Sequence, residues 1–151
     1  MLRGHCERNL DPKGRLMLPP EFREDVLKGS PEGKLMLAFL GECVAGYPMP
    51  EWERIEENLT GMNSMDPKIR NLQRFFISSA EEVTLDKQGR ILVPPYLRVQ
   101  ANLDKDCILA GVLTKFELWD KGAFESGRRA ARETFDADMA ALAEAGFELR
   151  F

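Results

Sequence analysis

One fourteen-residue motif occurs twice in the chain, at an offset of 75 residues and without a gap. Residues 10–23 read LDPKGRLMLPPEFR and residues 85–98 read LDKQGRILVPPYLR. Seven of the fourteen positions are identical, among them the glycine, both prolines and two arginines. Internal repetition constrains the fold strongly, because each copy specifies the same supersecondary unit. The sequence therefore predicts two related halves, 1–79 and 80–151.

Each copy of the motif begins with the signature of a tight turn. Asp11 occupies the first position, Pro12 the second and Gly14 the fourth, which suits a type I turn followed by a left-handed glycine. Residues 86–89 repeat this pattern without the proline. Apolar residues alternate in the flanking segments, as they do in a half-buried strand. We therefore expect each turn to join the two strands of a short hairpin, 6–10 with 15–18 and 82–85 with 90–93.

The rest of each half combines a second strand pair with amphipathic helices. The double prolines after each turn suit the first turn of a short helix. Trp52, Ile55 and Leu59 recur at helical spacing, and Asp66 before Pro67 is typical of a helix start. We expect strand pairs at 34–40 with 42–47 and at 107–112 with 115–119. We expect helices at 21–28, 51–62, 66–79, 96–101, 121–132 and 133–145, the last ending at Gly146.

Charge is distributed unevenly along the chain. The formal net charge of −4 has the wrong sign for a simple basic nucleic-acid binder. Residues 1–23 nevertheless carry five bases and three acids, whereas residues 24–65 carry three bases and eight acids. Residues 66–80 are again basic, with three bases and one acid. A local basic surface is therefore compatible with the acidic total.

Composition and motifs argue against several functional classes. The three cysteines (Cys6, Cys43 and Cys107) are widely spaced, and His5 is the only histidine, which disfavours a disulfide framework, a zinc site and His-based catalysis. No apolar run approaches the ~20 residues of a membrane helix, and the N-terminus lacks a secretory signal. Phosphate-binding glycine loops, nucleophile elbows and metalloprotease motifs are also absent. We expect a cytoplasmic protein without membrane association, metal or cofactor, which is not an enzyme.

The arginines at the two turns support two interpretations. Arg15 and Arg90 follow the turns directly, where a guanidinium can fork onto a phosphate or the edge of a guanine. Lys13 and Lys87 add charge within the turns, and a two-stranded ribbon is narrow enough to enter the major groove of DNA. The alternative is structural: Asp and Gly make the turn, and Arg pairs with Asp across it. Residue types alone leave both interpretations open.

The chain resembles the MraZ family, within the AbrB-like swapped-hairpin superfamily, over essentially its whole length. Both Asp-x-x-Gly-Arg motifs carry the resemblance, together with the Tyr47-Pro48 pair before Trp52 and the segment 116–120. Two such motifs in a chain of this length are specific, whereas one alone would not be. Phe124 is a departure, because the family often has Trp there.

The resemblance implies an α+β fold, a double-split β-barrel built from two swapped-hairpin (AbrB-like) repeats with flanking helices. It also implies a bacterial transcriptional regulator, expected to act as a repressor, of the division and cell-wall gene cluster. Such a protein binds repeated boxes in double-stranded promoter DNA, including its own promoter. It forms homo-oligomeric rings, from octamer to dodecamer, and associates with the nucleoid.

The resemblance assigns DNA binding to the turn residues. By position in this sequence they are Asp11, Lys13, Arg15, Asp86, Lys87 and Arg90. Asp11 and Asp86 would orient the arginines. We add Arg3 and Arg8 as candidates for phosphate contacts, and we expect Arg15 to contribute more than Arg90. The reason is that residues 1–23 have two more bases than acids, whereas bases and acids balance in residues 81–98.

An alternative function is a protein-interaction module without specific DNA binding. Swapped-hairpin relatives include antitoxins that hold a toxin, and the alanine-rich segment 137–145 is a candidate docking helix. In a ring, the acidic block 24–65 would need basic partners at subunit contacts. The candidates are Arg70, Arg74 and the run Arg128, Arg129 and Arg132.

Overall fold

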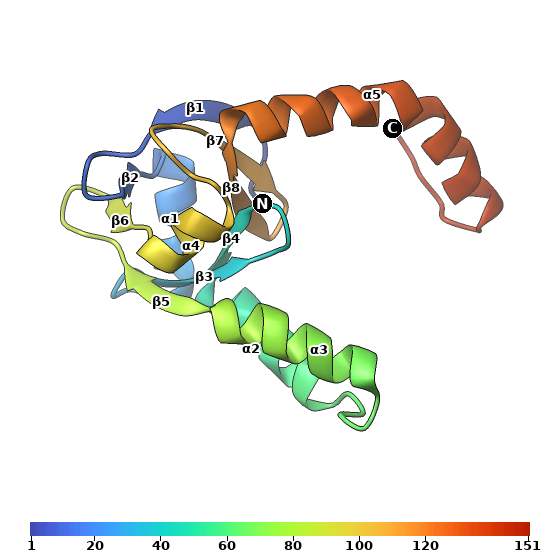
Figure 1. Cartoon of the computed structure of the whole chain (residues 1–151), viewed down its shortest axis with the longest axis horizontal. Coiled ribbons are helices and arrows are strands. Elements are labelled where there is room, and N and C mark those ends of the chain that lie inside the picture. Colours follow the sequence, from blue (N-terminus) through green and yellow to red (C-terminus); the bar gives the residue numbers. More distant parts are fainter. The chain divides into compact units, whose positions relative to one another are not determined.

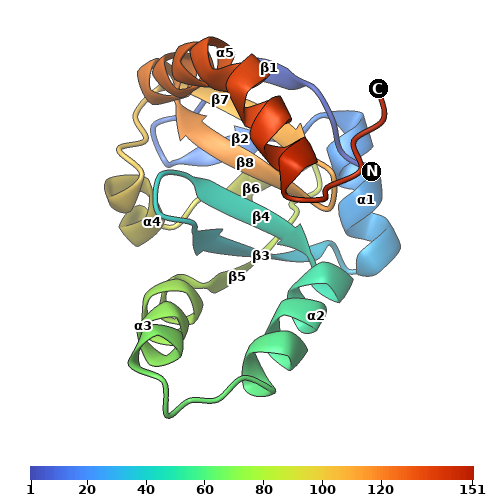
Figure 2. The same cartoon turned by 90° about the vertical axis from the view of Figure 1, so that its right-hand side faces the viewer.

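A computed structural model describes the whole chain, residues 1–151, and shows two compact units, 1–120 and 121–151 (Figure 1; Figure 2). The strands, all in the first unit, are β1 (His5–Asn9), β2 (Arg15–Met17), β3 (Lys34–Phe39), β4 (Val44–Pro48), β5 (Glu81–Thr84), β6 (Arg90–Leu92), β7 (Asp106–Val112) and β8 (Lys115–Asp120). Its helices are α1 (Pro20–Gly29), α2 (Met49–Thr60), α3 (Pro67–Phe76), the short 3-10 helix η1 (Ile77–Ser79) and α4 (Pro95–Gln100). The second unit contains α5 (Lys121–Glu144).

The strands form two antiparallel sheets. Six of them follow the order β1-β7-β8-β4-β3-β5, and β2 pairs with β6 in a separate two-stranded ribbon. The predicted α+β class is thereby confirmed, as are the predicted strand pairs β3–β4 and β7–β8. Strands from both halves of the sequence contribute to each sheet. No helix in the chain combines the length and apolar character that crossing a membrane requires.

The predicted hairpins at the two turns are wrong. After the first turn the chain does not fold back on β1, because β1 pairs with β7 while β2 pairs with β6. After the second turn, β5 likewise stays with β3. The physical reason lies in Leu16 and Ile91, cross-strand partners that are fully buried. An isolated hairpin could not bury them, whereas the exchanged ribbon places both against a core shared by the two halves.

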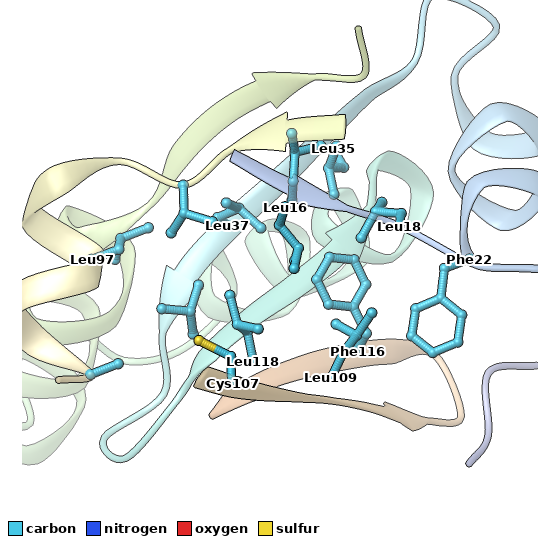
Figure 3. Close-up of a cluster of buried hydrophobic side chains, with 14 of the residues drawn as sticks. Leu16, Leu18, Phe22, Leu35, Leu37, Leu97, Cys107, Leu109, Phe116 and Leu118 are labelled. Carbon is cyan, nitrogen blue, oxygen red and sulfur yellow. The ribbon is translucent and has the colours of Figure 1, made fainter. Parts of the chain in front are cut away.

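The main core contains side chains from the large sheet, the ribbon, α1 and α4. Figure 3 shows Leu16 of β2 amid Leu37 of β3, Leu118 of β8 and Leu97 of α4, and each of the four is at most 1% exposed. Burying a leucine side chain stabilises a fold by about 1.5–3 kcal/mol. Gly46 on β4 contributes by its lack of a side chain, because a Cβ there would overlap the ring of Phe116.

A second apolar cluster joins α2 and α3 to the other face of β3 and β4. Trp52 and Leu59 of α2 are buried and Ile55 packs against them, which confirms the predicted stripe. The ring of Trp52 lies 5.6 Å from that of Phe76 in α3. The predicted start of α3 is also confirmed, because Asp66 accepts a hydrogen bond from the backbone N–H of Lys68 at 2.8 Å.

The C-terminal segment differs from the sequence prediction. Instead of two helices, 121–132 and 133–145, it forms the single helix α5. Nothing at residues 132–133 breaks a helix, since neither glycine nor proline occurs there. The predicted end is confirmed: Gly146 has φ +91°, and Phe147 donates to the carbonyl of Leu142 at 3.0 Å. None of the side chains of α5 is buried.

Candidate nucleic-acid interface

Loop 1 (residues 11–15) is organised by the carboxylate of Asp11. Its Oδ1 accepts hydrogen bonds from the backbone N–H groups of Lys13 (2.9 Å) and Arg15 (2.8 Å), and its Oδ2 accepts one from Arg15 Nε at 2.5 Å. The backbone N–H of Gly14 donates to the carbonyl of Asp11 at 2.9 Å, and Gly14 has φ +87°. The predicted turn, with aspartate at its first position and a left-handed glycine at its fourth, is confirmed.

Loop 2 (residues 86–90) has the same geometry. Asp86 Oδ1 accepts from the backbone N–H groups of Gln88 and Arg90, both at 2.9 Å, and Oδ2 accepts from Arg90 Nε at 2.8 Å. Gly89 donates to the carbonyl of Asp86 at 3.0 Å and has φ +79°. The repeat in the sequence is therefore also a repeat of hydrogen bonding.

The two Asp–Arg pairs use only part of each guanidinium. In both loops the ion pair and hydrogen bond run through Nε, and the Nη atoms of Arg15 and Arg90 have no partner within the chain. The carboxylate thus fixes the orientation of the arginine and leaves its outer donors unused. Two Nη groups in one plane can bind a phosphate, or the O6 and N7 acceptors of guanine. Pairing with Asp and binding of an anionic ligand are therefore compatible.

The hydrogen bonds lower the pKa of both aspartates. For Asp11 the largest cause is the backbone N–H of Arg15, which outweighs the opposing effect of desolvation, and the Arg15 side chain lowers the pKa further. The pKa of Asp86 is lowered in the same way by Arg90. Both loops are therefore held by charged carboxylates throughout the neutral range.

The ribbon of β2 and β6 presents its arginines on its outer face. In the antiparallel register Arg15 is opposite Leu92 and Met17 is opposite Arg90, while the buried Leu16–Ile91 pair faces inward. Along the strand direction the two arginines are two positions apart, which is about 7 Å. Met17 and Leu92 complete this face and are 40% and 51% exposed. Sequence reasoning gave them no role, although the alternation of residues along both strands places them beside the arginines.

The other predicted residues fall into two groups. Lys13 and Lys87 are exposed within loops 1 and 2, as expected. Arg3 and Arg8 instead line a separate cavity of about 700 Å³ between β1 and the start of α1. The Nε of Arg8 is buried and has no hydrogen-bond partner. Of the predicted DNA-binding residues, all except Arg3 and Arg8 therefore lie in the loops or on the ribbon.

Two arginines without a predicted role lie directly against the loops. Arg98 of α4 packs on Gly14 of loop 1, and Arg23 of α1 packs on Gly89 of loop 2. The signal was present in the sequence, because the repeated motif ends in the same arginine in both copies.

Two of the three cysteines are buried, and the potential metal ligands are dispersed. No group of three or more His, Cys, Asp or Glu side chains is arranged to hold a metal ion. Burial raises the pKa of the Cys43 thiol to about 12 and that of Cys107 to about 11. These two cysteines are core residues.

Comparisons with known proteins show that the whole chain is similar to one family. A family model described as "MraZ protein, putative antitoxin-like" matches the chain twice, at residues 1–75 and 76–145. A protein of Solidesulfovibrio magneticus named "Transcriptional regulator MraZ" is 56% identical over 153 residues, which cover all of both chains. Proteins of the same name from Maridesulfovibrio salexigens and Nitrosomonas eutropha are 47% and 40% identical, each over 149 residues. These alignments cover 99% of this chain and 98% and 100% of the two relatives.

Proposed function

This chain belongs to the MraZ family, and we propose that it is a transcriptional regulator that binds double-stranded promoter DNA through loops 1 and 2. The observation that carries the proposal is the pair of identical Asp–Arg arrangements, each with unused Nη donors, on the outer face of an exposed ribbon. The major groove of B-DNA, ~12 Å wide, admits a two-stranded ribbon. The names of the relatives support the same function.

In this proposal the loop residues have distinct roles. Arg15 and Arg90 contact base edges or phosphates, Lys13 and Lys87 contact phosphates, and the two aspartates orient the arginines. Arg3 and Arg8 are weaker candidates for phosphate contacts, because they line a separate cavity.

The proposal extends to the target and to the assembly. We infer repression of the division and cell-wall gene cluster, including the gene's own promoter, through repeated boxes, by a protein located on the nucleoid. We further infer a double-split barrel made of the repeats 1–79 and 80–151, and a ring of eight to twelve copies; family membership supports these statements. A ring would also reconcile the net charge of −4 with DNA binding, because several loops on several boxes gain roughly 10²–10⁴ in avidity.

The test is binding to DNA from the gene's own upstream region, beside a scrambled sequence, over a range of salt concentrations. We expect preference for the native DNA and a steep loss of affinity with salt, because each neutralised phosphate adds about −0.9 to the slope of log K against log salt. Arg15→Ala should weaken specific binding by roughly 1–3 kcal/mol for each base whose recognition it removes. Arg90→Ala should weaken it less.

The matched control is Arg150→Ala, an exposed arginine paired with Glu148. It removes the same charge outside both loops and the ribbon and should bind DNA like the wild type. Circular dichroism and sedimentation should show that Arg15→Ala keeps its fold and its assembly. Equal, weak binding to both DNAs, or unfolding of Arg15→Ala, would contradict the proposal and leave the loops with a structural role only.

A second candidate function is a protein-interaction module, and α5 is the observation that favours it. This helix buries none of its side chains, and Phe135 and Leu142 on it are 57% and 39% exposed. Phe135 and Leu142 are seven residues apart and so lie on one face of the helix, and an exposed apolar face is typical of a helix that binds another protein. A stoichiometric protein partner in a pull-down, together with no affinity for the promoter, would favour this function over DNA binding.

A further inference from the structure

The glycine of each loop is covered by an arginine from the other repeat. A Cβ atom built on Gly14 would lie 2.6 Å from Cζ and 2.7 Å from Nε of Arg98, so the guanidinium packs directly against the backbone of loop 1. A Cβ on Gly89 would lie 2.5 Å from Cδ and from Nη1 of Arg23, so loop 2 is covered in the same way. Glycine is therefore favoured at both positions for two reasons: φ is positive, and the arginine leaves no room for a Cβ atom.

Hydrogen bonds extend this contact to Val93, the residue directly after β6. Arg98 Nε donates to the carbonyl of Val93 at 3.0 Å, and the backbone N–H of Val93 donates to the carbonyl of Gly14 at 2.9 Å. Val93, Arg98 and Gly14 thus form a closed set of contacts between the second repeat and loop 1. On the other side, Leu18 donates to the carbonyl of Gly89 at 3.1 Å, but the Nε of Arg23 is buried without an acceptor. The contact with loop 1 is therefore the stronger of the two.

Neither Arg23 nor Arg98 neutralises a carboxylate. Arg23 and Arg98 form no ion pair, although both are only partly exposed. A half-buried arginine without an acidic partner is costly unless its packing or a ligand compensates. Here the planar guanidinium lies against a glycine, a contact that the ammonium of lysine does not reproduce.

We propose that Arg98 and Arg23 are positioning residues that hold loop 1 and loop 2, respectively, in the conformation that binds DNA. This inference rests on the function proposed above. It adds that each repeat supplies two arginines: one contacts DNA from the repeat's own loop, and the other supports the loop of the other repeat. Arg98 supports the Gly14–Arg15 peptide, so it acts on DNA through Arg15 rather than by its own charge. Substituting lysine keeps the charge and removes the support.

The first test uses the protein without DNA. In Arg98→Lys we expect hydrogen exchange of the Gly14 and Arg15 amides to accelerate about fivefold to tenfold, the equivalent of one ordinary intramolecular hydrogen bond. The Gly89 and Arg90 amides should exchange as in the wild type. Arg23→Lys should give the reverse pattern with a smaller effect, and it serves as the second variant if Arg98→Lys does not fold. Unchanged exchange in loop 1 of a folded Arg98→Lys protein would overturn the inference, whatever its outcome for DNA.

The second test is a double-mutant cycle on DNA affinity. We expect Arg98→Lys to weaken binding about fivefold to tenfold, and the Arg15→Ala, Arg98→Lys double variant to bind no more weakly than Arg15→Ala alone. Additive reductions in affinity, or full binding by Arg98→Lys with weaker binding by Arg98→Ala, would identify Arg98 as an independent phosphate contact and contradict a positioning role. Wild-type binding by Arg15→Ala would instead count against the proposed function, while hydrogen exchange still decides the support of the loop.

Discussion

At the scale of single residues, the site depends on the two oxygens of a carboxylate, both of which accept hydrogen bonds, whereas a side-chain amide has only one such oxygen. Asp11→Asn keeps an oxygen for the N–H groups of Lys13 and Arg15 but replaces Oδ2 with an NH₂ group, which cannot accept from Arg15 Nε. We expect DNA affinity to fall about 5- to 30-fold, because Arg15 loses the charge-assisted hydrogen bond that fixes its orientation. The melting temperature should change by less than about 4 °C. Fluorescence anisotropy and calorimetry measure the two effects.

Asp86→Asn provides the internal comparison, because Asp86 makes the same hydrogen bonds in loop 2. Asp138→Asn on α5, where the carboxylate accepts from Thr134 at 2.9 Å, controls for the loss of one negative charge. Tighter binding by both Asp11→Asn and Asp138→Asn would mean that net charge dominates. Unchanged affinity of Asp11→Asn would show that Arg15 does not need Asp11 for its orientation.

The same carboxylates determine how the loops respond to acid. Hydrogen bonds, first of all from the backbone of Arg15 and of Arg90, lower the pKa of Asp11 and Asp86 from the ordinary 3.8. A group whose pKa is lowered in the folded protein stabilises it above the unfolded pKa, and this contribution is lost as pH falls through the folded pKa. We expect the loops to be unchanged from about pH 8 down to about pH 5. In an NMR titration the two carboxyl groups should have midpoints below 3.8, and a midpoint above that value would contradict the hydrogen bonding.

At the scale of elements, two turn glycines separate backbone strain from packing. Gly14 (φ +87°) lies under Arg98, whereas Gly41 in the β3–β4 turn (φ +90°) has nothing within 4 Å of its Cβ position. We expect Gly41→Ala to lower the free energy of unfolding by about 1 kcal/mol, the cost of the backbone conformation alone. Gly14→Ala should lower it by about 2–4 kcal/mol, since Arg98 must also move. Urea denaturation measures both, and equal reductions would show that Arg98 yields without cost.

Element identity could be predicted from local patterns, whereas element pairing could not. Alternation, proline position and the Asp66 cap act within a few residues, and the elements they predict are present. The partners of β1 and β2 depend instead on where Leu16 and Ile91 can be buried, which involves residues 75 apart. The predicted division of α5 is wrong for a different reason: residues 132–133 contain neither glycine nor proline, so nothing local ends a helix there.

In the candidate site, too, local features could be predicted from the sequence and long-range contacts could not. Loop geometry could be predicted, because Asp11, Gly14 and Arg15 are close in sequence and their hydrogen bonds are local. The support from Arg23 and Arg98 could not, because each arginine crosses to the loop of the other repeat. The repeated motif indicates that both arginines are needed, but only the three-dimensional structure shows that they pack on Gly14 and Gly89.

At the scale of the whole molecule, the proposed ring requires an acidic chain to assemble without its acidic surfaces repelling one another. The acidic residues of α2 (Glu51, Glu53, Glu56 and Glu57) are close in sequence to the basic residues of α3 (Lys68, Arg70 and Arg74). Within the chain the only ion pair on these two helices joins Arg54 to Glu51, so the charges of α3 have no acidic partner. In the proposed ring, contacts between α3 of one copy and α2 of another would pair these charges.

Reversing the charge at Arg74 tests this arrangement. We expect Arg74→Glu to sediment as smaller species than the wild type at the same concentration, because a like charge opposite the acidic block costs on the order of several kcal/mol across an interface. Lys105→Glu, an exposed lysine between α4 and β7, makes the same change in net charge and should leave the assembly intact. An unchanged ring in Arg74→Glu would exclude this residue as the partner of the acidic block.

The same variant separates assembly from the chemistry of the loops, because Arg74 lines a groove between α2 and α3 and contacts neither loop. On a DNA fragment with one box we expect Arg74→Glu to bind like the wild type. On the whole upstream region its affinity should fall by roughly 10²–10⁴, the gain that linked binding sites provide. Equal reductions on both fragments would mean that Arg74 acts on DNA directly, and no reduction on either would mean that affinity does not depend on the ring. A selective reduction would show that this acidic chain binds a polyanion through the number of its loops, each held by an Asp–Arg pair, and not through the net charge of the subunit.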